Sequence, residues 1–314
     1  MGDRSAPPTR SIVVICTRNR PGELEKALTD VRAIAPTLEV LVADSSEPQQ
    51  KAEVRRVVTD ATSCSLLDCT PGLARQRNQA LDWIRGQRVD TQIVHFIDDD
   101  TEPEPGYFAA VERAFATDPR LGGVGGVVVN QPFPRFQLAK YVFALYSRRP
   151  GVVLRSGRST IGHYEGHEAT RAQWLPGCAM SYRLDAIGSI AFDNRLEGYS
   201  LGEDLYFSYA LSRTHRLTIA KDARVVHHLS PVNRHSAERI SRERIELLHR
   251  FVRENRDRGL RLSAFWWSVL GEAMLHFAHA VGARDPEALA RARGVAIGGV
   301  HALRHPLPSG HEAP

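Results

Sequence analysis

The first third of the chain alternates between short continuous apolar runs and stretches in which apolar residues recur three and four positions apart. The first pattern predicts buried strands and the second predicts amphipathic helices. Strands are predicted at 11–16, 38–43, 66–67, 93–97 and 124–129, and helices at 21–31, 73–84 and 105–115. This rhythm predicts an α/β fold with a doubly wound, mainly parallel sheet flanked by helices. Its ligand is expected at the carboxyl ends of the strands.

Polar side chains follow three of these predicted strands where each one ends. Thr17, Arg18 and Arg20 follow the first, Asp44 follows the second, and three consecutive acids at 98–100 follow the fourth. A helix cap, a turn or a surface residue would explain each one alone. Because the carboxyl ends of parallel strands meet at one crevice, their shared position favours a binding site.

The acidic cluster Asp98-Asp99-Asp100 closes a buried apolar run. Adjacent carboxylates in a desolvated pocket repel one another, and a divalent cation or a hydrogen-bond network must hold them ionised. Alternate side chains of a strand share a face, so Asp98 and Asp100 converge while Asp99 points away. This arrangement suits Mg²⁺ or Mn²⁺ binding a diphosphate. A solvated acidic turn is the simpler alternative.

Two further motifs stand in the second half of the chain. Glu203 and Asp204 precede an apolar stretch, in the first turn of a predicted helix, where the helix dipole favours carboxylates. An ordinary acidic helix start would have the same sequence. His227 and His228 follow a strand-like run at 223–226, so only one imidazole faces the crevice. Alternation does not say which one, and a buried histidine bonded to backbone is the alternative to a metal ligand.

Composition restricts the class of protein. The chain has 314 residues, of which 42% are hydrophobic and 25% charged, as in an ordinary globular protein. The net charge of +5 fits an anionic ligand, an anionic lipid surface or simply a solvated exterior. No GxGxxG follows the first strand and no GxxxxGK[ST] occurs, which disfavours dinucleotide-dependent redox chemistry and P-loop phosphoryl transfer. No motif for nucleic-acid binding is present.

Cysteine spacing and hydropathy bear on the compartment. The four cysteines form no CxxC pair, so neither a disulfide framework nor a zinc site is indicated, and a reducing cytoplasm is expected. The amino terminus lacks the apolar core of a signal peptide. The aromatic stretch at 260–281 is interrupted by Glu272, His276 and His279, which a membrane span rarely tolerates.

Taken in order, several motifs resemble those of the family 2 glycosyltransferases, which have the GT-A fold and use nucleotide-sugar donors. They are Cys16-Thr17-Arg18-Asn19-Arg20, Asp44, the run from Gly72 to Ala80, Asp98-Asp99-Asp100, Trp174-Leu175-Pro176-Gly177, Gly202-Glu203-Asp204-Leu205 and His227-His228. The resemblance covers about residues 10–235. Each motif is weak alone, whereas the ordered set is specific.

The resemblance implies roles for particular residues. The donor-binding residues would be Thr17, Arg18, Arg20, Asp44, Arg77, Asn78, Asp98 and Asp99, with Asp44 on the base and the division of work among the three acids open. An exposed helix face is the alternative for Arg77 and Asn78. Asp100 would be the principal metal ligand, joined by His227 or His228. Trp174, Pro176 and Gly177 would line the sugar or acceptor pocket. Asp204 would be the general base, with Glu203 beside it.

The implied reaction is an inverting, metal-dependent transfer from a nucleoside-diphosphate sugar, with UDP favoured, to an acceptor hydroxyl on a sugar, a lipid-linked molecule or a small molecule. Mg²⁺ or Mn²⁺ would assist. A sugar-phosphate nucleotidyltransferase and a non-catalytic nucleotide-sugar-binding protein are the alternatives. The first would use a glycine-rich basic loop after the first strand, and the second would not need the acids at 203–204.

The expected domains are a nucleotide-sugar-binding half at 10–130, an acceptor-binding and catalytic half at 131–235, a C-terminal helical region at 236–303 and a flexible tail at 304–314. Residues 234–261 hold nine arginines against five acids at largely helical spacing. This appendage could rest on an anionic membrane, pack on the catalytic domain, or form a homodimer. We therefore expect a cytoplasmic protein, either free or peripheral at the inner face of the membrane.

Overall fold

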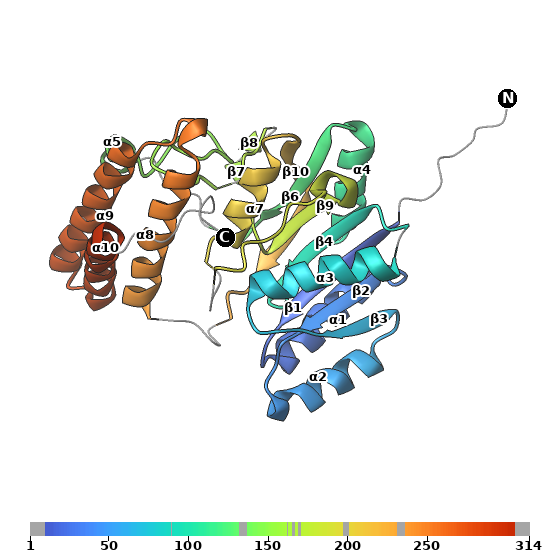
Figure 1. Ribbon diagram of the computed structural model, residues 1–314. Helices are drawn as coiled ribbons and strands as arrows, with labels where there is room; N and C mark the ends of the chain where they lie inside the picture. The colour runs from blue at the N-terminus through green and yellow to red at the C-terminus, as the bar shows by residue number, and fades with distance from the viewer. Residues whose placement is uncertain are drawn as a thin grey trace. The chain divides into compact units, whose positions relative to one another are not determined.

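The computed structural model describes residues 10–88, 90–131, 137–161, 163–164, 167–168, 171–196, 201–230 and 236–304. The chain divides into two compact units (Figure 1). The first combines Met1–Gln131 with Glu168–Val232, and the second combines Pro132–His167 with Asn233–Pro314. The second unit thus takes in a segment that we expected in the catalytic half. The tail expected beyond Arg304 lies outside the described residues.

A mixed sheet of eight strands forms the first unit, in the order β3-β2-β1-β4-β9-β6-β10-β5. Strands β3, β2, β1 and β4 run parallel, as does the pair of β6 and β10, whereas β9 runs antiparallel between β4 and β6 and β5 runs antiparallel to β10. The bounds are β1 (Ser11–Thr17), β2 (Glu39–Asp44), β3 (Cys64–Asp68), β4 (Ile93–Asp98), β5 (Thr101–Pro103), β6 (Leu121–Val128), β9 (Ala179–Arg183) and β10 (Arg216–His227).

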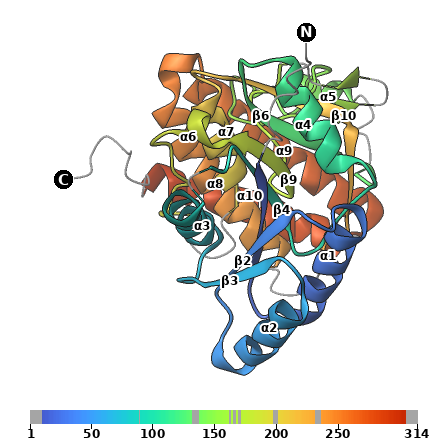
Figure 2. The same cartoon turned by 90° about the vertical axis from the view of Figure 1, so that its right-hand side faces the viewer.

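Helices cover both faces of this sheet (Figure 2). Those of the first unit are α1 (Pro21–Ile34), α2 (Pro48–Asp60), α3 (Leu73–Gln87), α4 (Tyr107–Thr117), α6 (Leu184–Ile187) and α7 (Glu203–Leu211). The strand-helix alternation confirms the predicted α/β class. Helix α2 was not predicted, because only three of its residues are buried and its sequence is mostly polar.

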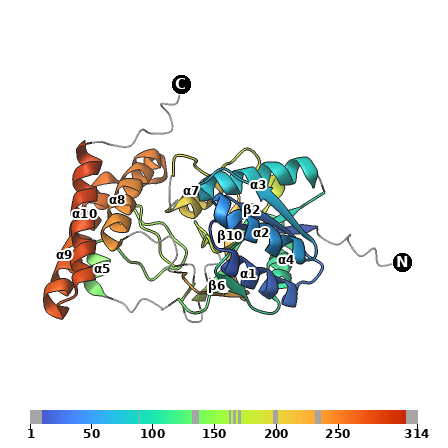
Figure 3. The same ribbon diagram turned by 90° about the horizontal axis from the view of Figure 1, so that it is seen from below.

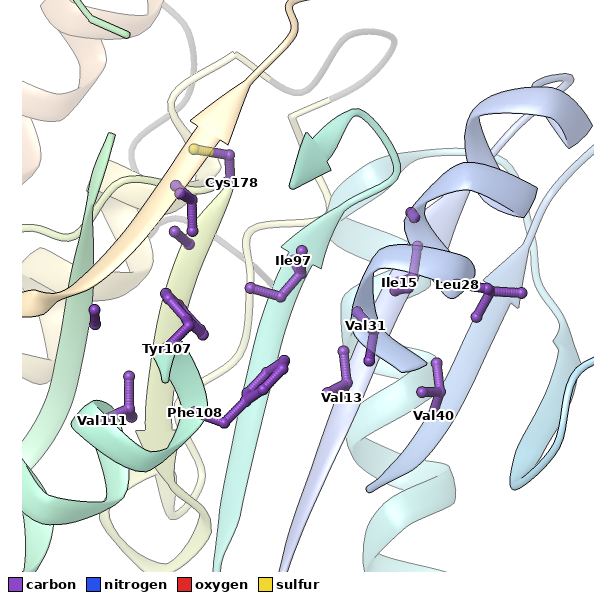
Figure 4. Close-up of a cluster of buried hydrophobic side chains, with 14 of the residues drawn as sticks. Val13, Ile15, Leu28, Val31, Val40, Ile97, Tyr107, Phe108, Val111 and Cys178 are labelled. Atoms are coloured by element: carbon purple, nitrogen blue, oxygen red, sulfur yellow. The ribbon is translucent and has the colours of Figure 1, made fainter. Parts of the chain in front are cut away.

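Alternate residues of β1 belong to separate hydrophobic cores, as the period of two in a strand requires. Val13 and Ile15 pack with α1, α2 and α4 in one core (Figure 4). Ile12 and Val14 pack with α3 and α7 in the other. Burying such a side chain stabilises a fold by about 1.5–3 kcal/mol. With both faces buried, the sheet holds the ends of its strands in fixed positions.

Helices also dominate the second unit (Figure 3). They are α5 (Leu138–Val142), α8 (Ala237–Glu254), the short 3₁₀ helix η1 (Arg256–Arg258), α9 (Leu262–Ala283) and α10 (Pro286–Arg304), and a two-stranded sheet pairs β7 (His163–Tyr164) with β8 (His167–Glu168). Helix α10 packs on both α8 and α9. Among the described helices, none combines the length and the apolar character that a membrane crossing requires.

Candidate active site

An acid-imidazole cluster forms where β4, the following turn and β10 meet. Asp98 ends β4, Asp100 lies in the turn, and His227 ends β10. Strand β5 carries the turn back along β10, where Thr101 is the Cα partner of His227. One ligand atom from each of Asp98, Asp100 and His227 lies within 4.8 Å of the other two. The pattern of alternation predicted the convergence of the two acids, and of the two histidines that the sequence left open the structure places His227 beside them.

Asp100 is the most tightly held member of this cluster. Its Oδ1 lies 3.0 Å from His227 Nε2, and its Oδ2 accepts a 2.8 Å hydrogen bond from the backbone amide of Ser230. Burial opposes its charge, but the hydrogen bond from His227 lowers the pKa of Asp100 below its usual value. Burial likewise opposes a charged His227, yet its bonds with Asp100 and the Cys178 thiol raise its pKa to about 10.

The neighbouring imidazole of His228 faces different partners. Its Nε2 lies 2.9 Å from Glu102 Oε2 and 3.5 Å from Lys26 Nζ, and its ring is half exposed. Its backbone amide donates to the backbone carbonyl of Asp100 over 2.9 Å. The structure therefore brings His227 into the acidic cluster and places His228 in a surface ion network.

Asp99 points away from the cluster into the protein. Its carboxylate accepts hydrogen bonds from Thr17 Oγ1 at 2.7 Å and from Arg20 Nη1 at 3.0 Å. Burial raises the pKa of Asp99 to about 7, although Arg20 and Thr17 act to lower it. One carboxylate oxygen is thus bound by the last residue of β1 and the other by the loop that follows it. This contact fixes the loop against the acidic turn.

Asp44 ends β2 and is fully buried. Its Oδ1 accepts hydrogen bonds from the backbone amide and the hydroxyl of Ser46, at 2.9 and 2.5 Å. Its Oδ2 is buried and has no hydrogen-bond partner within the described part of the chain. A buried acceptor without a donor is costly, so this oxygen marks a place where a ligand donor could bind. Arg18 nearby is exposed, with Nη2 3.6 Å from Glu47 Oε1.

The Arg77 side chain is buried between two acids from distant elements. Its Nη1 donates to Glu203 Oε1 over 2.5 Å, and its Nη2 donates to Asp98 Oδ1 over 3.1 Å. Nη2 also donates to the carbonyl oxygen of Gly177 over 3.1 Å. One guanidinium therefore connects the acid-imidazole cluster, the loop at 174–178 and the start of α7.

Burial alone would lower the pKa of Arg77, but the charges of Glu203 and Asp98 raise it well above its ordinary value. The guanidinium carbon also lies 5.7 Å from the ring centroid of Phe96 and 5.5 Å from that of Phe192. Cation–π contacts of this kind are worth more when they are desolvated. Arg77 is therefore a fixed positive charge inside the protein.

The acids of α7 lie side by side under the 174–178 loop. Gly202 precedes them in the left-handed region, with φ of 81°. Asp204 Oδ1 accepts from the amide of Leu205 at 2.7 Å, and its Oδ2 accepts from the amide of Gly177 at 3.0 Å. Burial raises the pKa of both Glu203 and Asp204, while Arg77 acts to lower both. Their shared desolvation makes one of them a suitable proton acceptor.

A side chain at Gly177 would crowd the two acids of α7. A Cβ there would lie 3.1 Å from Glu203 Oε1 and 3.2 Å from Asp204 Oδ2. Trp174 and Pro176 in the same loop are half-buried. The loop is tied to α7 because the amide of Leu175 donates to Ser208 Oγ over 3.1 Å.

Asn78 holds a neighbouring loop. Its side-chain amide donates to the carbonyl of Phe192 over 2.8 Å and accepts from the amide of the same residue over 2.9 Å. It also donates to Asn194 Oδ1 over 2.9 Å. The side chain is thus engaged with the protein itself, next to the Phe192 ring that flanks Arg77.

Three residues of the site were overlooked in the sequence. Gln76 is buried, and its Nε2 donates to the carbonyls of Thr17 and Ala43, which joins the ends of β1 and β2. Ser230 holds Asp100, and Cys178 contacts His227. Gln76 lies inside the run from Gly72 to Ala80, which could have drawn attention to it, whereas nothing in the sequence marks Ser230.

The doubly wound α/β sheet, with this acid-imidazole cluster at its strand ends, agrees with the GT-A type of glycosyltransferase. Residues 12–167, about half of the chain, match the family model described as "Glycosyl transferase family 2", and the chain belongs to that family. No curated protein sequence matches the chain.

Solved structures give the same fold. The mannosyltransferase PcManGT from Pyrobaculum calidifontis, in complex with GDP-Man and Mn²⁺, is similar with a TM-score of 0.55 and 20% identity over 95% of this chain and 76% of that one. GalNAc-T7 with UDP, GalNAc and Mn²⁺ is similar with a TM-score of 0.52 and 16% identity over 70% of this chain. The match spans only 44% of that second protein. The predicted fold class and enzyme class are confirmed.

Proposed function

We propose that this glycosyltransferase transfers a sugar, with inversion, from a nucleoside-diphosphate donor to an acceptor hydroxyl. A UDP-sugar is the favoured donor. The observation that carries the proposal is the pair of contacts made by Arg77, which joins Asp98 of the acidic cluster to Glu203 beside Asp204. A donor diphosphate at the cluster and an acceptor at α7 would then lie on opposite sides of one transferring sugar.

The nucleotide would bind at the ends of β1 and β2. The buried Asp44 Oδ2, which has no partner among the described residues, would accept an N–H of the base. Arg18 directly follows β1 and is exposed, so its guanidinium would meet the diphosphate. Thr17, Arg20 and Asp99 would hold the shape of the intervening loop, because their polar groups bond one another.

Asp98, Asp100 and His227 fit a resident Mn²⁺ or Mg²⁺. Two carboxylates and one imidazole would supply oxygen and nitrogen ligands of the kind that these cations take, and the donor diphosphate would supply further oxygens. The cation would act as a Lewis acid that neutralises the departing diphosphate. PcManGT and GalNAc-T7 were both solved with Mn²⁺, which supports the choice of metal.

Asp204 would remove the proton of the acceptor hydroxyl as that oxygen attacks the anomeric carbon. Its raised pKa makes it a stronger base than an exposed carboxylate, and two backbone amides hold its oxygens in place. Glu203 is bound by Arg77 and would shape the acceptor side, together with Trp174 and Pro176. A single displacement on the face opposite the leaving group inverts the anomeric centre.

The cytoplasm is the compartment that we propose. All four cysteines are free thiols. Disulfides form and persist in oxidising compartments, so free thiols at four positions favour a reducing one.

A panel of UDP-, GDP- and dTDP-sugars tests the function. The protein should hydrolyse or transfer from one donor class with Mn²⁺ or Mg²⁺ present, and chelation with EDTA should stop the reaction. NMR of the product should show the anomeric configuration opposite to that of the donor. The proposal would be contradicted if none of the donors were consumed under any metal condition. A product that retains the anomeric configuration of the donor would contradict it as well.

A further inference from the structure

One face of α9 exposes a row of large apolar side chains to solvent. The row consists of Trp267, Leu270, Met274, Phe277 and Val281, which we call the α9 stripe, and each member is between 46% and 66% exposed. The spacings alternate between three and four residues, which places all five on one side of the helix. The stripe runs for about 21 Å along the axis.

The opposite face of α9 carries the charge that a surface helix usually turns outward. Glu272 is the only residue of α9 with a formal charge, and it is buried. It forms ion pairs with Arg158 and Arg244, and those charges lower its pKa to about 2 against the effect of burial. The helix therefore has its charged residue inside and its apolar residues outside, the reverse of a helix that packs only on its own core.

Helix α5 lies beside α9 (Figure 1), and its exposed apolar side chains add to the stripe. Trp267 Nε1 donates to the carbonyl of Val142 over 2.8 Å, and the Trp267 ring lies 5.0 Å from that of Phe143. Leu138 and Val142 on this helix are exposed as well. These contacts hold the indole in a fixed orientation, as an anchor at an interface requires.

We propose that the α9 stripe binds the α9 stripe of a second copy of this chain, with the two helices antiparallel. Residues alternately three and four apart are the a and d positions of a coiled-coil seam. A twofold axis at Met274 would set Trp267 opposite Val281 of the partner subunit and Leu270 within one helical position of Phe277 of the partner subunit. Each aromatic side chain then meets a smaller aliphatic one, and Met274 meets Met274 of the partner subunit, so every residue of the stripe has a counterpart.

The available area matches this occupant. The stripe with Leu138 and Val142 offers seven side chains that are about half exposed, on the order of 700 Å² per copy, where a standard interface buries roughly 800 Å² per partner. A soluble monomer seldom leaves so large a contiguous apolar patch in water.

A lipid surface fits the same face less well. A helix that lies on a membrane has lysines and arginines along its polar face. Within α9 there is no lysine or arginine, and its polar side is occupied by the buried pairs of Glu272. The proposal concerns assembly and does not depend on the donor or on Asp204.

Light scattering of the full chain during size exclusion tests the dimer. The wild-type chain of 34.9 kDa should elute with twice that mass. Met274→Glu should elute with the mass of a monomer, or its dimer should be at least tenfold weaker, because the dimer would bury two carboxylates on the twofold axis. Ala109→Glu, at an exposed position of α4 in the first unit, is the matched control and should stay dimeric. Circular dichroism should show that both variants are folded.

Cross-linking tests the position of the axis. Met274→Cys should form disulfide-linked dimers under mild oxidation, whereas Ala109→Cys and the wild-type chain should not. A monomeric wild-type chain, a folded Met274→Glu variant that remains dimeric, or an uncross-linked Met274→Cys would each overturn the proposal. So would a monomer that floats with vesicles of phosphatidylcholine and phosphatidylglycerol, since the face would then belong to lipid. Donor turnover is a separate measurement, so its failure would leave this result standing.

Discussion

Arg77 and Glu203 form a buried ion pair with 2.5 Å between Nη1 and Oε1, although 126 positions separate them in the chain. The same guanidinium binds Asp98, so one side chain of α3 positions an acid of the cluster and an acid of α7. Neither end of the pair has meaningful access to water. The acids of the site therefore depend on a residue that a donor sugar need not contact.

Replacement of Arg77 by methionine should destabilise the protein. The change leaves Glu203 buried without its counter-charge, and breaking a buried pair by removing one partner costs about 3–5 kcal/mol. The free energy of unfolding, measured by denaturant titration, should fall by that amount. Arg85→Met on the same helix is the control, because Arg85 pairs with the exposed Asp82 and should contribute less than about 1 kcal/mol. Equal losses in the two variants would contradict a special role for Arg77.

A second change should relieve part of this loss. Glu203→Gln removes the charge that Arg77→Met leaves uncompensated, so the double variant should be more stable than the sum of the two single changes predicts. The coupling should exceed about 1 kcal/mol, because the two residues are in direct contact. Additive effects would mean that the two groups do not interact in solution.

Asp204→Asn should stop transfer while donor binding persists. The amide keeps the size of the carboxylate but does not accept the acceptor's proton, so turnover should fall by roughly 10²–10⁴. Calorimetric titration of the donor should give a Kd within about twofold of the wild-type value, as expected when an interaction is made only in the transition state. Asp82→Asn, on the exposed face of α3, should retain full activity. Near-normal turnover in the Asp204 variant would remove it from the base role.

The two adjacent histidines should differ in their effect on metal binding. His227 contributes to the cluster with Asp98 and Asp100, whereas His228 contacts Glu102 and Lys26 at the surface. His227→Ala should raise the Kd for Mn²⁺ at least tenfold, since even outer-shell changes at metal sites cost 10- to about 100-fold. His228→Ala is its matched control and should change the Kd by less than about twofold. Titration of Mn²⁺ followed by electron paramagnetic resonance measures both, and equal affinities would reject the imidazole ligand.

The parts of the fold that the sequence predicted are those with a local pattern. Strands β1, β2 and β4 are continuous apolar runs, and α1 repeats its buried residues at three and four. Helix α2 was not predicted, because only Val54, Val57 and Val58 of its thirteen residues are buried. The antiparallel position of β9 between β4 and β6 was not predicted either. Pairing between strands that are distant in the chain produces no periodic pattern in a single sequence.

The residues of the site also divide into those that a local sequence pattern predicts and those that it does not. The convergence of Asp98 and Asp100 follows from alternation at the end of a strand, and the structure bears this out. The contacts of Arg77 with both Asp98 and Glu203 do not follow from the sequence, because an arginine in a helical pattern is expected to be exposed. Its burial depends on Glu203 and on the Phe192 ring, and both arrive from the far half of the chain. The same holds for Ser230, whose backbone amide, not its side-chain type, binds Asp100.

His95 should make the protein less stable as the pH falls. It is fully buried, its Nδ1 lies 2.8 Å from Ser181 Oγ, and burial lowers its pKa to about 3. Between about pH 6.5 and 3 the unfolded chain binds a proton there that the folded chain does not, so stability falls by about 1.4 kcal/mol per pH unit. Above about pH 7 this contribution is constant. At pH 5 the loss relative to neutral pH should be about 2 kcal/mol.

His95→Gln isolates this contribution, because every other group titrates alike in the two proteins and glutamine does not take up a proton in this range. Denaturant titrations from pH 7.5 to pH 5 should give the two proteins parallel stabilities above pH 7, whatever the cost of the substitution itself. Below pH 6.5 the wild-type curve should fall more steeply, so that the difference between the two shifts by about 2 kcal/mol at pH 5. A constant difference across the whole range would mean that His95 takes up its proton inside the folded protein, which its burial against Phe108 argues against.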